Sequence, residues 1–238
     1  MSYSLALGDR AYSSWSLRAG LLVDRFDLPV TCRFARLYDP GFAALMAEFA
    51  PARTVPALRT PEGTVICESL AIAEELASRF PDRGLWPADP AARATARGLA
   101  AEMHAGFTAL RTDCPMNLRV AYQGFEPSDE VRADLARLDE IWAAARAATA
   151  SAGPWLCGDY SIADAFFAPV AARIATYGLP VSPVAKTYVA AHLAEPAFLR
   201  WRAASLSDGL DQPVYAMALP ERRWPGPAAD ADDASDAR

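Results

Sequence analysis

The chain has 238 residues, of which 53% are hydrophobic and 22% charged, a composition typical of a globular protein with ample core material. Its formal net charge of −6 argues against a nucleic-acid-binding surface, which needs clustered lysine and arginine. The N-terminus lacks the basic start and apolar core of a signal peptide, and no apolar stretch is long enough to cross a bilayer. We therefore expect a cytoplasmic protein without nucleic-acid or membrane partners.

The first 80 residues alternate short strand-like runs with helical ones. We expect helices at 16–26, 41–49 and 68–80, and strands at 3–7, 30–34, 55–59 and 64–66, the last two joined by a Pro-Glu-Gly turn. The early βαβ unit favours a parallel strand pair. The order β-α-β-α-β-β-α predicts an α/β thioredoxin-like domain over residues 1–80.

The rest of the chain is predominantly helical. Residues 81–90 contain three prolines and a glycine, a composition typical of a linker. We expect an all-α helical-bundle domain over 91–219, with its first helical stretch kinked at Pro115. Residues 220–238 are rich in proline, alanine and aspartate, and we expect them to form a flexible acidic tail.

Ser161 and Asp164 have the spacing of a capping box, in which each side chain accepts a backbone N–H of the other residue. The helix that follows is apolar on nearly every side, so we expect it to be buried. The two residues could also suggest a catalytic Ser–Asp pair, but capping explains both.

The junction of the first strand and first helix carries Tyr12-Ser13-Ser14-Trp15-Ser16-Leu17-Arg18. Hydroxyl groups at a helix N-terminus lie beside unpaired backbone N–H groups, where an anion is favoured. Two further segments follow, Arg53-Thr54-Val55-Pro56 and Cys67-Glu68-Ser69. Each segment is unremarkable alone, and it is their combination and order along the chain that make them informative about the family.

Together with the helix after Ser161, these segments resemble the glutathione transferase superfamily over nearly the whole chain, and its serine-type, zeta-like and related bacterial members most. The resemblance implies that a serine donates to the sulfur of bound glutathione. Ser14 matches the theta- and delta-type pattern and Ser13 the zeta-type pattern, and we favour Ser14. The implied glutathione-binding residues are Thr54, Val55, Pro56, Glu68 and Ser69.

Two departures from the family pattern concern Trp15, where cysteine or proline is common, and Arg53-Thr54, which replaces Gly-Lys. The electrophile would lie between the two domains, and its site would include Trp15, His104 and Arg111. Arg111 could stabilise negative charge on an acidic substrate, although an ordinary solvated or salt-bridged arginine is the simpler interpretation. A catalytic base at His104 is not needed by a thiolate mechanism.

The resulting hypothesis is a glutathione S-transferase that ionises the glutathione thiol and delivers it to a small hydrophobic electrophile, as in detoxification. Two alternatives are a glutathione-dependent isomerase (maleylacetoacetate-type), dehalogenase or peroxidase, and a non-enzymatic ligand-binding or interaction protein on the same fold. The four cysteines form no Cys-x-x-Cys motif, so we expect free thiols and no metal. The resemblance also implies a homodimer, and apolar residues around the linker could form an exposed patch for it: Phe80, Leu85 and Trp86.

Overall fold

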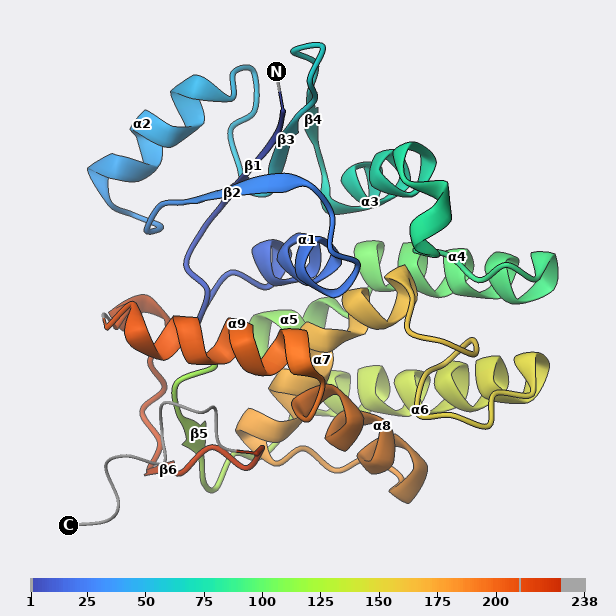
Figure 1. Cartoon of the computed structure of the whole chain (residues 1–238). Coiled ribbons are helices and arrows are strands. Elements are labelled where there is room, and N and C mark those ends of the chain that lie inside the picture. Colours follow the sequence, from blue (N-terminus) through green and yellow to red (C-terminus); the bar gives the residue numbers. More distant parts are fainter. Residues whose placement is uncertain (1, 210, 228–238) are drawn as a thin grey trace.

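The computed structural model describes residues 2–209 and 211–227 and has an N-terminal half built on a four-stranded sheet (Figure 1). The strand order is β2-β1-β3-β4, in which β1 and β2 are parallel and the other pairs antiparallel. The strands are β1 (Tyr3–Leu7), β2 (Val30–Phe34), β3 (Ala57–Arg59) and β4 (Val65–Cys67), and the helices are α1 (Ser14–Arg25), α2 (Pro40–Glu48) and α3 (Ser69–Arg79). The expected thioredoxin-like order is confirmed.

Alternation along the strands gives the sheet two different faces. Leu5, Leu7 and Leu58 are buried in the main core, which α1 and α3 share. Ala6 and Ala57 point to the other face, into a smaller core that α2 covers. Because side chains alternate with a period of two, neighbouring residues of one strand serve both cores.

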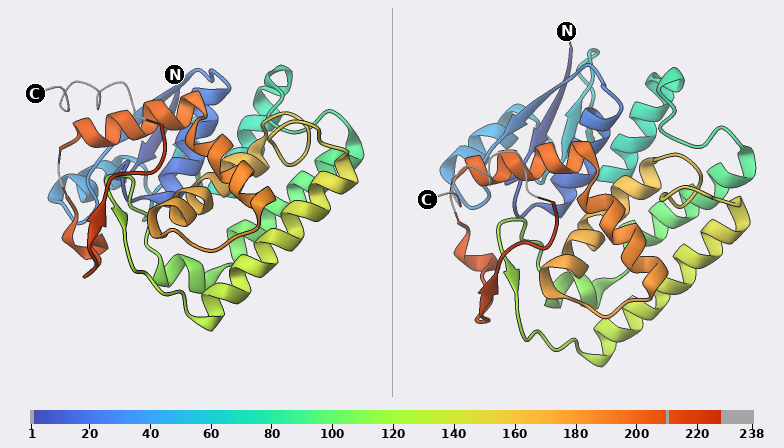
Figure 2. Two further views of the ribbon diagram at one scale, coloured as in Figure 1. Left: turned by 90° about the horizontal axis from the view of Figure 1, so that it is seen from below. Right: turned by 60° about the horizontal axis from the view of Figure 1, so that its bottom comes forward.

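The C-terminal half is helical. Its helices are α4 (Pro90–Ala105), α5 (Thr108–Asp113), α6 (Asp129–Thr149), α7 (Ile162–Tyr177), α8 (Pro183–Leu193) and α9 (Pro196–Ser207). The long helices α4 and α6 lie side by side, while α7 runs through the interior (Figure 2). None of the described helices combines the length and hydropathy that a bilayer crossing requires.

The predicted kink at Pro115 is wrong. The helical stretch from Pro90 ends at Ala105, and α5 starts after Phe107, whose φ of 58° is left-handed. α5 ends at Asp113, two residues before Pro115, as is usual for a helix that approaches a proline.

Asp164 is a buried acceptor for three neighbouring residues. It accepts the backbone N–H of Ser161 at 2.9 Å, as the capping pattern predicts, and also the N–H of Leu156 at 3.2 Å. The hydroxyl groups of Ser161 and Tyr188 donate to it at 3.3 and 2.9 Å. This arrangement supports a structural role that ties α7 to the preceding loop and to α8.

Helix α9 closes the N-terminal half by lying against α1 (Figure 1). The contact depends on Gly20, because a Cβ atom there would lie 1.9 Å from the ring of Trp201. The indole Nε1 of Trp201 donates to the carbonyl oxygen of Arg10 at 2.9 Å. The last long helix of the chain thus packs directly on its first.

Two further expectations need correction. Leu85 is 2% exposed and its carbonyl oxygen accepts the N–H of Ile162, so the linker does not form the exposed patch expected for a dimer. Beyond residue 219, Glu221–Arg222 forms β6, which pairs with β5 (Ala121–Tyr122), and Trp224 is buried. The segment 220–227 is therefore held by the fold, and the rest of the expected tail, 228–238, lies outside the described residues.

Candidate active site

The two candidate serines occupy different positions at the start of α1. Ser13 is the N-cap: its Oγ accepts the N–H of Ser16 at 3.3 Å and its hydroxyl donates to Ser16 Oγ at 2.8 Å. Ser16 Oγ also accepts the N–H of Gly8, so this network is internal to the strand–helix junction. Ser14 is half-buried, and its Oγ accepts a hydrogen bond from Arg173 Nη2 at 3.4 Å. Among the described residues, no group accepts the hydroxyl hydrogen of Ser14.

The N-terminus of α3 has polar groups without hydrogen-bond partners, an arrangement that favours binding of an anion. Glu68 is the N-cap with a φ of 68°, and its side chain makes no capping hydrogen bond. The Oγ of Ser69 is buried and has no partner within the described part of the chain. Unpaired N–H groups and a buried hydroxyl favour a bound carboxylate, while the carboxylate of Glu68 is exposed and accessible to an ammonium group.

Between these helix starts lies Val55, which precedes Pro56 through a cis peptide bond. The backbone N–H and C=O of Val55 have no hydrogen-bond partner among the described residues. Two open backbone groups beside a cavity allow an extended peptide to pair with the chain, as in strand addition.

Two adjoining cavities connect these features. The larger, of about 290 Å³, is lined by Ser13, Ser14, Arg111 and Arg173, among others. The smaller, of about 230 Å³, is lined by Pro56, Glu68 and Ser69. Trp15, Thr54 and Val55 line both cavities. The structure thus gathers the residues singled out from the sequence around these cavities, except His104, which lines neither of them. Their individual roles remain predictions.

Trp15 is surrounded by cationic groups. The guanidinium carbons of Arg18 and Arg111 lie 4.4 and 4.7 Å from the centre of its ring, within cation–π range. Burial lowers the pKa of both arginines, and Arg18 lies near the further positive charge of Arg173. In the described part of the chain, no carboxylate contributes to the pKa of Arg18, Arg111 or Arg173. The larger cavity therefore has an uncompensated positive potential.

His104 lies behind Trp15, with ring centres 5.3 Å apart, and its Nε2 is 3.5 Å from a carboxylate oxygen of Glu68. Burial and the neighbouring Arg18 lower the pKa of His104, which favours the neutral form of its ring. The cavities contain no cysteine side chain, and burial raises the pKa of Cys32 to about 11 and that of Cys114 and Cys157 to about 12. These three thiols are therefore poor nucleophiles at neutral pH.

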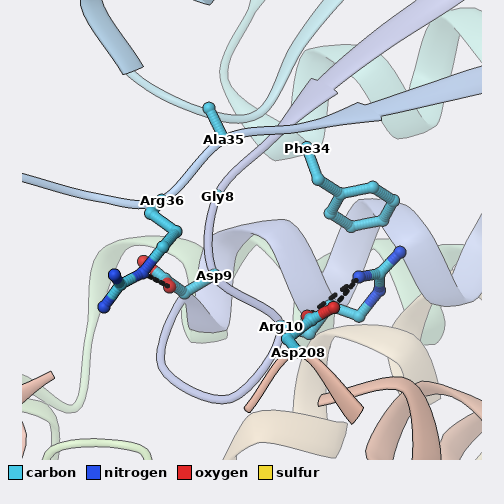
Figure 3. A pocket seen from close by; sticks show the side chains of 7 residues that line it. All are labelled: Gly8, Asp9, Arg10, Phe34, Ala35, Arg36 and Asp208. Carbon is cyan, nitrogen blue, oxygen red and sulfur yellow. Dashed lines mark hydrogen bonds and ion pairs between the residues drawn. The ribbon is translucent and has the colours of Figure 1, made fainter. Parts of the chain in front are cut away.

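A third cavity, of about 190 Å³, lies at the β1–α1 loop and differs in its charge balance (Figure 3). Arg10 forms an ion pair with Asp208 at 2.8 Å and also covers the ring of Phe34 at 3.5 Å. Arg36 lies 3.9 Å from Asp9 (Figure 3). Each cation there has its own carboxylate, so this cavity lacks the unpaired groups that distinguish the site at Ser14.

Sequence reasoning missed Arg173 and Arg18 as parts of this site. Arg173 is the one charged residue between Ala165 and Tyr177 in a helix that is otherwise apolar on nearly every side. A charged residue in such a helix is rarely buried without a purpose, which is the signal that could have found it. Arg173 and Ser14 are 159 positions apart in the sequence, so no local pattern reveals their contact.

Comparison with known proteins agrees with this architecture. Residues 12–79 match the family model of the glutathione S-transferase N-terminal domain. A maleylacetoacetate isomerase from Pseudomonas aeruginosa is 34% identical over 114 residues, which are 46% of this chain and 52% of that protein. The chain therefore matches about half the length of this curated relative.

Solved structures extend the likeness of fold to the helical half. A glutathione transferase homologue from Burkholderia BGR1 with bound glutathione superposes with a TM-score of 0.63 at 24% identity, covering 88% of this chain and 100% of that one. Glutathione transferase Omega 2S from Trametes versicolor gives a TM-score of 0.66 at 21% identity, with 90% and 99% covered. Residues 12–79 thus match the glutathione S-transferase N-terminal domain in sequence, and the chain shares the fold of solved glutathione transferases.

Proposed function

We propose that this protein is a glutathione S-transferase that binds glutathione across the two adjoining cavities and presents its thiolate to an electrophile in the larger one. The unpartnered hydroxyl of Ser69 and the uncapped start of α3 receive the γ-glutamyl carboxylate, while Glu68 receives the ammonium group. The open backbone groups of Val55 pair with the cysteinyl unit. This path leads the sulfur toward the start of α1, which lines the same space.

The hydrogen bonds of the two serines at the start of α1 decide which of them we assign as the thiol donor. The hydroxyl hydrogen of Ser13 is already donated to Ser16, whereas that of Ser14 is free. A hydroxyl group has one hydrogen to donate, so of these two serines only Ser14 can donate to the sulfur without breaking an existing bond. Ser14 is therefore the thiol donor in this proposal, and Ser13 holds the helix start in place.

The energy required is modest. A thiol with a pKa of about 8.5 is only a few per cent ionised at pH 7. Lowering that pKa by about two units takes roughly 2.7 kcal/mol of preferential stabilisation of the thiolate. One hydrogen bond to a charged acceptor contributes about 1.5–3 kcal/mol, and a helix N-terminus adds about 0.3–1 kcal/mol. The serine and the helix together suffice.

The sulfur then attacks an electrophilic carbon. With a chloronitrobenzene, a carbon–sulfur bond forms, chloride leaves with the bonding electron pair, and the thiol proton passes to solvent. Arg111 and Arg173 line the cavity where negative charge develops on the electrophile, and their charges are uncompensated. Preorganised cations at that position stabilise the anionic intermediate more than the neutral ground state.

The same arginines favour a second candidate, isomerisation of an unsaturated acid. There the thiolate adds to one carbon of the double bond, the remaining single bond rotates, and expulsion of the sulfur regenerates glutathione. A carboxylate on the substrate fits a cavity lined by Arg111 and Arg173, and the curated relative is named as a maleylacetoacetate isomerase.

Purified full-length protein distinguishes these functions. Conjugation of a chloronitrobenzene with loss of glutathione supports the transferase, whereas turnover of an unsaturated acid with glutathione recovered supports the isomerase. A chloronitrobenzoate and its neutral amide form a matched pair: a preference for the acid that Arg111→Gln abolishes supports recognition of a carboxylate. Binding to immobilised glutathione without turnover of any electrophile would refute an enzymatic role.

A further inference from the structure

The side chain of Arg173 joins three parts of the molecule that are distant in the sequence. Its Nε donates to the carbonyl oxygen of Cys114 at 2.8 Å, and its Nη1 donates to that of Pro169 at 3.3 Å. Its Nη2 donates to Ser14 Oγ at 3.4 Å. The side chain of this α7 residue therefore crosses from the helical half to the first turn of α1 in the thioredoxin-like half.

Two of these bonds fix the third. A guanidinium group is planar and its N–H groups point in set directions, so anchoring Nε and Nη1 to carbonyl oxygens determines where Nη2 points. Arg173 is only 4% exposed, which leaves the group little freedom to turn. Its charge persists at neutral pH, since burial and the nearby Arg111 lower its pKa only to about 10.

The contact constrains the hydroxyl group of Ser14. A serine oxygen has one hydrogen and two lone pairs, and Arg173 occupies a lone pair because a guanidinium can only donate. The hydroxyl hydrogen must then point away from Nη2. Ser14 lines the larger cavity, and no other described group accepts that hydrogen, so it is left for a ligand in the cavity. The distance of 3.4 Å is long for a hydrogen bond, as is common before a ligand completes a site.

We propose that Arg173 is a positioning residue that orients the hydroxyl of Ser14 toward the glutathione sulfur and thereby couples the helical half of the protein to thiol ionisation. The inference rests on the proposed function, because it needs a thiolate at Ser14. It adds a residue of α7 to a thiol site otherwise built from the N-terminal half. Its consequence is that activation of the thiol depends on how α7 sits against α1.

Titration of the thiolate absorbance of the glutathione complex tests this. Arg173→Lys keeps the positive charge but cannot hold both carbonyl oxygens and Ser14 at once. We expect it to raise the thiol pKa by about 0.5–1 unit, because a hydroxyl that is no longer held in place loses only part of its hydrogen bond to the thiolate. The glutathione KM should be nearly unchanged, while kcat below the thiol pKa falls about three- to tenfold. In a Ser14→Ala background the same substitution should produce no further shift.

Arg146→Lys is the matched control. Arg146 also ties a helix to a loop through backbone carbonyl oxygens, of Gly153, Pro154 and Trp155, and it lines neither cavity of the site. Its substitution should leave the thiol pKa unchanged. The control therefore distinguishes the loss of any arginine that binds backbone carbonyl oxygens from the loss of the one that contacts Ser14.

The outcomes separate the two proposals. If Ser14→Ala leaves the thiol pKa unchanged, the proposed thiol donor is wrong. If Ser14→Ala raises it and Arg173→Lys does not, the role of Arg173 alone is overturned. An equal shift from Arg173→Lys with and without Ser14 would show a direct effect on the sulfur and also overturn it. Should Arg173→Lys fail to fold, a crystal structure of the unaltered protein with glutathione decides: Ser14 Oγ should contact both Nη2 and the sulfur, and an Oγ turned away from Nη2 contradicts the inference.

Discussion

Replacing Ser13 and Ser14 separately by alanine should produce two different failures. Ser14→Ala removes the free hydroxyl donor at the start of α1 that lines the larger cavity, while the helix keeps its cap at Ser13. A hydrogen bond to a charged acceptor contributes about 1.5–3 kcal/mol, which corresponds to a rise of about 1–2 units in the pKa of the bound thiol. The Arg173 Nη2 left without its acceptor also loses one contact, so we expect a small loss of stability as well.

Ser13→Ala has the opposite profile. It removes the cap that accepts the N–H of Ser16 and leaves Ser16 Oγ without the hydroxyl that donates to it. Loss of an N-cap costs about 0.5–2 kcal/mol in the free energy of unfolding. The thiol pKa should change by much less than one unit, because in this arrangement Ser13 makes no contact with the sulfur.

The assay combines two measurements on each variant: denaturant unfolding for stability and thiolate absorbance against pH, with saturating glutathione, for the bound thiol. If the thiol pKa rises in Ser13→Ala and stays unchanged in Ser14→Ala, the assignment of Ser14 as the thiol donor is refuted. The donor to the thiolate would then be Ser13, whose hydroxyl must first break its hydrogen bond to Ser16 Oγ.

Three further predictions concern affinity, stability and assembly. Ser69→Ala removes the unpartnered hydroxyl at the start of α3 and should raise the glutathione KM several-fold with kcat nearly unchanged, and steady-state kinetics that show a loss of kcat alone would contradict it. Asp164→Ala leaves the buried donors of Leu156, Ser161 and Tyr188 unpaired and should cost more than about 2 kcal/mol of unfolding free energy, at 1–3 kcal/mol for each buried donor that stays unsatisfied; normal stability with no activity would instead point to a catalytic Asp164. Finally, light scattering at micromolar concentration should give twice the mass of the chain, as closed two-fold assemblies are common among soluble proteins, and a monomer would disprove the dimer.

The sequence predicted the fold well where local rules decide it. The strands 3–7 and 30–34 were placed at their observed bounds, because alternating apolar runs and the βαβ order leave few options. The cap at Ser161 was predicted for the same reason, since its chemistry involves residues three positions apart.

Local sequence rules do not predict contacts between residues that are distant in the sequence. The pairing of β5 with β6 joins residues about a hundred positions apart, and two-residue strands leave no periodicity to detect. From the sequence alone, Leu85 is expected to be an exposed linker residue. In the structure it is buried, and its carbonyl oxygen accepts the N–H of Ile162 at the start of α7. The positive charge at the larger cavity also depends on the packing of three separate helices. Arg111 of α5 and Arg173 of α7 line the cavity, and Arg18 of α1 is buried close to them.

The packing of Trp201 against Gly20 has a consequence for how the protein is made. The thioredoxin-like half leaves the ribosome first, yet α1 is covered by α7 and α9, which are synthesised more than a hundred residues later. A nascent chain that ends near residue 80 holds Ser14, Val55 and Ser69 but exposes the apolar surface that Trp201 and α7 will cover. The thioredoxin-like half therefore reaches its final structure only when almost the entire chain has been translated, and a fragment of residues 1–80 would not reproduce the site.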